Sequence, residues 1–182
     1  MANASDQSLL EAVLDSWDRN NAILVNLLRA VAAAERPTEA GKLEVGLPAA
    51  GRLAVRAMEG GPSVAELFTH IHYVRLVFVF EDAPEFARDV PAEEWVGEHD
   101  PARIAQMLNE SAKAVRDAVR SRVEAGRDMD LHYDHPILLL QHMIWHEGYH
   151  HGQIKLALKV AGRPISDKKA GPVTWGVWMR KK

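Results

Sequence analysis

The stretch from residue 134 to residue 162 reads DHPILLLQHMIWHEGYHHGQIKLALKVAG. Its apolar residues recur every three or four positions, which is the spacing of one face of an α-helix. A proline follows its first polar residues, and Gly162 with Pro164 just beyond closes it, as is usual at helix ends. The sequence therefore predicts a long amphipathic helix here, and this helix carries most of the chain's histidines.

Three further segments show the same periodicity, and helices are expected over residues 6–35, 63–81 and 100–126. Ser63 and Glu66 have the spacing of a capping box, in which each side chain binds the other's free backbone N–H. Asp100 followed by Pro101 is typical of a helix start. No segment predicts a β-strand. The expected fold class is all-α, a four-helix bundle with a long crossover between helices 1 and 2, in a single domain over residues 1–182.

The crossover, residues 36–62, is rich in Gly, Ala and Pro, and a short helix is expected near residues 53–58. The C-terminal tail, residues 163–182, is basic and contains Trp175 and Trp178. A basic aromatic tail is a possible nucleic-acid patch, but such tails are more often solvated or folded back on the domain.

Composition excludes several classes of function. The formal net charge is −3, so no overall positive field attracts nucleic acid or an anionic membrane. The chain has no cysteine, which excludes Cys nucleophiles, Cys-ligated zinc and disulfides. The N-terminus lacks the basic-then-apolar pattern of a signal peptide, and no apolar run reaches the ~20 residues of a membrane span. We therefore expect a cytoplasmic protein that binds neither nucleic acid nor membranes.

Nine histidines stand out, and His142, His146 and His150 are spaced four residues apart. Opposite the polar residues of their helix, His146 and His150 are expected at the centre of the buried face. Two core histidines with hydrogen-bond partners would explain this, but a pair at i and i+4 also suits a metal ion. A third ligand from the second helix is either His70 or His72, which lie about 160° apart around the axis. Periodicity alone favours neither.

The remaining histidines have simpler interpretations. His142 is a candidate neighbour of the metal or a fourth ligand, and His151 is expected at the surface. The other three, His99, His132 and His135, fall in loops or at a helix start, where a solvated histidine is the usual case. Gly148 and Gly152 lie on one side of the last helix, which suggests close approach of another helix, either of the same chain or of a second subunit.

Residues 146–150, HEGYH, match the zinc-peptidase pattern H-E-x-x-H. Such peptidases take a third ligand from further along the chain, a Glu or another His. After Glu147 the only acidic residue is Asp167, and Leu156 stands where the longer motif needs its third His. A zinc peptidase is therefore not expected.

Two motifs give the chain its resemblance to a known family. Residues 63–71, SVAELFTHI, resemble the pattern S-x-x-E-L-L-x-H-I/L, with Phe68 in place of the second Leu. Residues 146–154, HEGYHHGQI, match H-x-x-x-H-x-G-Q-I/L. In this order and about 75 residues apart, they resemble the DinB-like superfamily of YfiT-like metal-dependent hydrolases. Outside the motifs the likeness extends only to helix number, crossover and length.

The resemblance implies a bundle, often dimeric, whose divalent metal is held by His70, His146 and His150. It also implies a role beside the metal or in the structure for Gln153. Zinc and nickel both suit three histidines. Some members of this family transfer low-molecular-weight thiols to small electrophiles, and others are classed as hydrolases. The catalytic residues and the substrate are left open.

Two interpretations without catalysis remain beside this one. The bundle could bind a metal or a small ligand without turnover, or its histidines could be structural in an interaction module. Fold alone does not decide among them. Metal analysis combined with an activity screen distinguishes all three.

Overall fold

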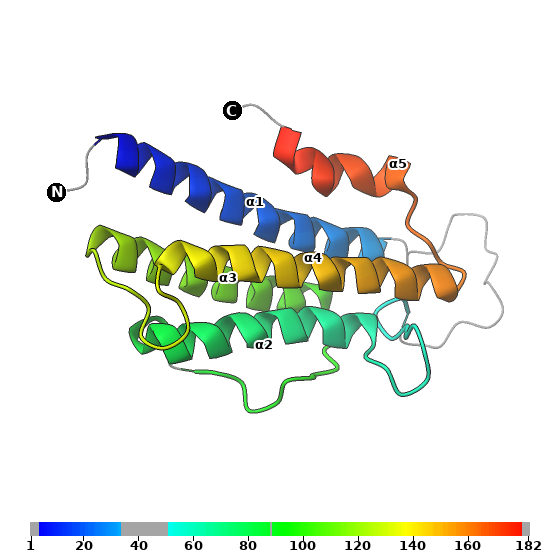
Figure 1. The fold of residues 1–182 in the computed structure, drawn as a ribbon. Helices are drawn as coiled ribbons and strands as arrows, with labels where there is room; N and C mark the ends of the chain where they lie inside the picture. Colours follow the sequence, from blue (N-terminus) through cyan, green and yellow to red (C-terminus); the bar gives the residue numbers. More distant parts are fainter. Residues whose placement is uncertain (1–3, 34–50, 88, 180–182) are drawn as a thin grey trace.

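Four long helices form most of the molecule, a computed structural model that describes residues 4–33, 51–87 and 89–179 (Figure 1). They are α1 (Ala4–Ala33), α2 (Val64–Asp82), α3 (Pro101–Glu124) and α4 (Pro136–Val160). α1 and α2 each contact both α3 and α4, and the helices run alongside one another. Within the described ranges the chain has an isolated bridge between Arg56 and Ser63 but no strand. The prediction of an all-α protein is confirmed.

The predicted helix-start signals work as expected. Ser63 Oγ accepts from the backbone N–H of Glu66 at 3.2 Å, and the Glu66 carboxylate accepts from the N–H of Ser63 at 2.6 Å. Asp100 accepts from the N–H of Ala102 at 2.9 Å at the start of α3. Gly126 and Gly162 follow α3 and α4 with φ values of +60° and +72°, a conformation that glycine adopts without strain.

The expected short helix near residues 53–58 does not form. The carbonyl groups of Leu53 and Val55 instead accept from the N–H groups of Ala65 and Val64, at 2.8 and 2.9 Å. These contacts pair the end of the crossover with the first turn of α2, so the same carbonyls are not available for a helix. The rest of the crossover, residues 34–50, lies outside the described residues.

The C-terminal segment folds back on α1 (Figure 1). It consists of α5 (Asp167–Ala170) and two 3₁₀ turns, η2 (Gly171–Val173) and η3 (Trp175–Met179). Arg19 donates to the carbonyl of Val177 at 2.8 Å, and Asn26 donates to that of Val173 at 2.6 Å. These bonds explain why the basic tail is part of the fold up to residue 179.

A layer of polar side chains divides the apolar core into two clusters. The first contains Leu28, Phe68, Leu108 and Ile154, and the second contains Trp17, Val79, Val115 and Met143, so that each helix contributes to both. Between them each of the four long helices contributes a buried polar residue to this layer: Asn20, Arg75, Ser111 and Glu147. This layer lies at the level where α4 carries His146 and His150.

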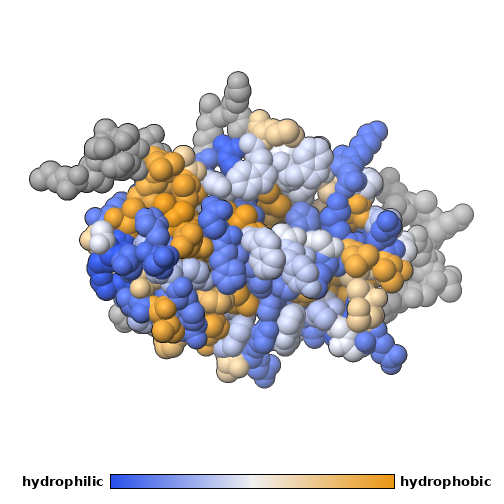
Figure 2. Space-filling model, viewed as in Figure 1, coloured by the Kyte–Doolittle hydropathy of each residue, from blue (hydrophilic) through white to orange (hydrophobic). Residues whose placement is uncertain are grey.

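The outer surface mixes apolar and polar side chains, as the face in Figure 2 shows. On α4 the exposed apolar residues are Leu138, Trp145, Tyr149, Leu156 and Val160. Among the helices of the described residues, none combines the length and the hydrophobicity needed to cross a bilayer.

Candidate metal centre

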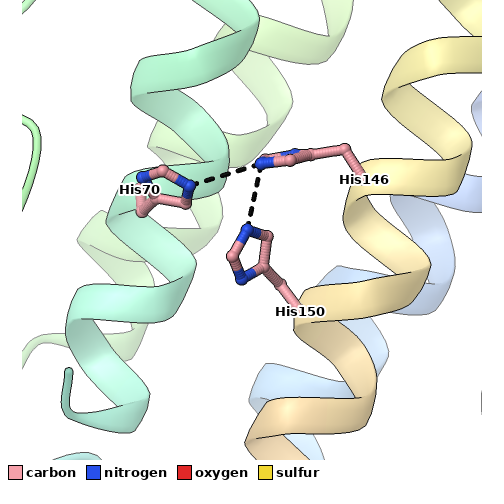
Figure 3. Close-up of side chains that lie close together, drawn as sticks. All are labelled: His70, His146 and His150. Carbon is pink, nitrogen blue, oxygen red and sulfur yellow. Dashed lines mark hydrogen bonds between the residues drawn. The ribbon is translucent and has the colours of Figure 1, made fainter. Parts of the chain in front are cut away.

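His70 of α2 and His146 and His150 of α4 point toward a common centre (Figure 3). The Nε2 atom of His146 lies 3.3 Å from Nε2 of His70 and 3.0 Å from Nε2 of His150. A divalent ion at about 2.0–2.1 Å from each nitrogen places neighbouring ligand atoms about 3.0–3.4 Å apart. The three side chains are thus placed so that they could hold a metal ion.

Burial keeps these imidazoles neutral. Burial, together with the smaller effect of the neighbouring histidines, lowers the pKa of His70 to about 4 and that of His146 to about 3. Burial also lowers the pKa of His150, against the opposing effect of its hydrogen bond to Gln153. Neutral imidazoles each have one nitrogen lone pair, which is the form that binds metal.

The Nδ1 atoms lie on the sides of the three rings that are turned away from the common centre. Nδ1 of His150 lies 2.7 Å from Oε1 of Gln153, and because an amide oxygen only accepts, this Nδ1 carries the proton. The lone pair of His150 is therefore on Nε2, toward the other two rings. Nδ1 of His70 lies 3.0 Å from Oε1 of Glu94, although not in hydrogen-bond alignment. Nδ1 of His146 is buried and has no hydrogen-bond partner among the described residues.

The segment between α2 and α3 covers His70. The indole of Trp95 stacks on its ring, with centroids 4.2 Å apart and planes within 3°. Thr69 holds Val96, the residue after Trp95, because its Oγ1 donates to the Val96 carbonyl at 2.8 Å. Glu94 and Trp95 both remain partly exposed, at 45% of the carboxylate side chain and 41% of the tryptophan. One side of the site is therefore formed by an aromatic residue at the protein surface.

His72 lies away from this cluster. Its Nδ1 is 2.7 Å from the carbonyl of Met107 on α3, and the ring is buried. The two α2 histidines thus face different helices, as their angular separation requires. Of the two candidates for the third position, the structure brings His70 to the α4 pair.

The buried face of α4 is not the one expected from the sequence, because Glu147 lies on it. The expectation that His146 lies at the centre of the buried face is wrong, because His146 is partly exposed while Glu147 is only 1% exposed. The carboxylate of Glu147 accepts from Nε and Nη2 of Arg75 at 2.6 and 2.9 Å, and from Asn20. Glu147 therefore has a buried partner of its own, which is not the role of the general base in a zinc peptidase.

The other histidines take structural positions. Nδ1 of His142 lies 2.7 Å from the hydroxyl of Tyr133, so it is outside the group of three. His132 is not simply solvated, since Asp82 lies 2.9 Å from its Nδ1. His135 accepts from the N–H of Ile137 at the start of α4, and His151 is half-buried.

The two glycines of α4, Gly148 and Gly152, have no close neighbour in the part of the chain that the structure describes. A Cβ atom built on Gly148 or Gly152 meets no atom of the described residues within 4 Å. Among the described residues the expected approach of another helix is therefore wrong, and the approach of a helix from a second subunit stays a prediction.

Sequence reasoning missed the segment 94–96 and the Arg75–Glu147 pair. Residues 94–96 match no motif, and their contacts depend on how the loop between α2 and α3 folds over α2. For the second a signal was present, because Arg75 is the only Asp, Glu, Lys or Arg in residues 67–80 and Glu147 is the only one in residues 136–154. In comparisons with protein-family models, with curated proteins and with solved structures, none matched this chain.

Proposed function

We propose that the chain is a metal-dependent enzyme of the DinB-like superfamily, with the four-helix bundle of that family. In this proposal His70, His146 and His150 hold a divalent ion, zinc or nickel. The observation that supports it is the convergence of three neutral Nε2 atoms from two helices, at 3.0 and 3.3 Å.

The surrounding residues fit such an ion. Gln153 fixes the proton of His150 on Nδ1, and Glu94 is the carboxylate nearest to Nδ1 of His70. Partners of this kind orient the ligands of metal sites and increase their basicity. Without an ion, the two Nε2 contacts of His146 can be hydrogen bonds in which one imidazole donates to its neighbour, whereas a cation would bind a lone pair from each of the three rings.

An ion held by three histidines with an open coordination position can lower the pKa of water toward about 7 or hold a thiol as the thiolate. The chain has no cysteine, so a thiol nucleophile would arrive with the cosubstrate. Trp95 and Tyr149 are partly exposed aromatic residues beside His70 and His150, and they would contact the apolar part of a small electrophile. The reaction we propose is hydrolysis or thiol transfer.

Metal analysis and an activity screen test the proposal together. The purified protein is loaded with Zn²⁺ or Ni²⁺ and assayed for loss of aryl halides, epoxides and esters, with and without a low-molecular-weight thiol. We expect one equivalent of metal and a metal-dependent loss that is absent in His150→Ala and retained in His72→Ala. Bound metal without turnover would support the non-catalytic alternative, and absence of bound metal would contradict the proposal.

A further inference from the structure

The polar layer of the core connects all four long helices through Arg75 and Glu147. Besides its two bonds to Glu147, Arg75 donates from Nη1 to Oδ1 of Asn21 at 3.0 Å and to the carbonyl of Leu108 at 2.8 Å. Its guanidinium lies 4.8 Å from the ring centroid of Trp17. Arg75 and Glu147 are at most 1% exposed, so the pair itself is inside the core.

A contribution to the stability of the fold does not by itself explain why a buried ion pair is present here. Removing two charges from water is costly, and apolar residues of similar volume are often as stabilising or more so. A bidentate guanidinium–carboxylate pair is directional, however, whereas apolar side chains can slide past one another. A buried polar residue in a layer of an otherwise apolar helix interface is a known way to fix helix register.

The pair joins the same two helices that carry the histidines. Arg75 is five residues after His70 on α2, and Glu147 directly follows His146 on α4. Metal sites require their ligands within about 0.5 Å and 10–20° of the productive geometry. A small rotation of α4, or a slide along α2, would move His146 and His150 away from His70.

We infer that Arg75 and Glu147 are positioning residues, whose buried pair fixes the rotation and register of α4 against α2 and so holds His146 and His150 opposite His70. The inference rests on the proposed function as far as it concerns metal. It assigns the conspicuous glutamate of HEGYH a role in aligning the helices.

The test replaces the pair by apolar residues, Arg75→Met with Glu147→Leu. We expect a helical protein whose melting temperature is equal to or above that of the wild type, and a Zn²⁺ affinity that is at least about tenfold lower in chelator competition. The matched control, Arg116→Gln with Asp18→Asn, removes an exposed pair between α1 and α3 and should leave the affinity unchanged. Wild-type affinity in the apolar variant would overturn the inference.

A conservative variant covers the case in which the apolar variant does not fold. Glu147→Gln keeps one acceptor oxygen for Arg75, so a folded protein with a loss of Zn²⁺ affinity of about threefold is expected. An unchanged affinity in this variant would count against the inference.

A measurement without metal separates the inference from the proposed function. Because the chain has no cysteine, Glu81→Cys and Leu156→Cys allow spin labels on exposed sites of α2 and α4. Pulsed electron paramagnetic resonance should give a broader or shifted distance distribution in the Arg75→Met/Glu147→Leu background. If the distribution is unchanged, the pair does not set the register; if it broadens while the wild type binds no metal, only the proposed function fails.

Discussion

Helices α2 and α4 bury two polar clusters next to each other, and the clusters differ in how fully their polar atoms are paired. In the Arg75–Glu147 pair all three guanidinium nitrogens donate and both carboxylate oxygens accept. In the histidine cluster three Nε2 atoms face one another, and Nδ1 of His146 has no partner among the described residues. Buried polar groups are normally satisfied. The Arg75–Glu147 pair is thus satisfied within the protein, whereas the histidine cluster leaves a buried nitrogen unpaired among the described residues and could hold a metal ion.

Breaking the paired cluster should have the largest effect on stability. Glu147→Ala leaves the Arg75 guanidinium buried without its counter-charge, and we expect the free energy of unfolding to fall by about 3–5 kcal/mol. His150→Ala in metal-free protein should cost clearly less, because no buried charge loses a partner. Urea unfolding of both variants measures the difference. A cost below about 1 kcal/mol for Glu147→Ala would contradict the structural role.

Acid should destabilise the metal-free protein through the histidine cluster. Burial holds the pKa of His70 at about 4 and that of His146 at about 3, whereas an unfolded histidine titrates near 6.5. Between pH 6.5 and 4 the unfolded chain binds protons that the folded chain excludes, so the contribution present above pH 6.5 is lost as the pH falls. We expect a loss of about 2–4 kcal/mol from pH 6.5 to pH 4.5.

Urea unfolding at these two pH values, in the presence of a chelator, measures this loss. His146→Leu removes one of the two groups and should show a smaller pH dependence. The same slope in this variant and in the wild type would contradict the assignment.

The two clusters show which features of the structure can be predicted from the sequence and which cannot. Helix limits followed from local signals such as Ser63 with Glu66, because capping depends on neighbours in the chain. The i, i+4 pair His146 and His150 followed from helix periodicity. The partner of Glu147 did not, because pairing with Arg75 depends on how two helices pack, and a charged residue is by default assigned to the surface.

The same reasoning applies to His70. Periodicity left His70 and His72 equal. The resemblance implied His70, and in the structure the packing of α2 against α3 and α4 separates the two. The contacts of residues 94–96 were beyond sequence reasoning, since a loop without a motif has no periodicity to read.

The outer partners of the histidines should have smaller effects, on metal affinity. Gln153→Leu removes the acceptor for Nδ1 of His150, and we expect a 10–100-fold loss of Zn²⁺ affinity. Glu94→Ala should cost less, because Glu94 is about half-exposed and its contact to His70 is not aligned. Glu93→Ala, in the same segment, is the matched control. Equal affinities for wild type and Gln153→Leu would show that Gln153 does not orient His150.

The central claim is that His70, His146 and His150 form one metal site, and titration with Zn²⁺ against a chelating indicator tests it most directly. We predict one equivalent bound by the wild type, an affinity loss of more than about 100-fold in His70→Ala, and nearly unchanged affinity in His72→Ala. The reverse ranking of the two variants, or a wild type that binds no zinc, would contradict the account.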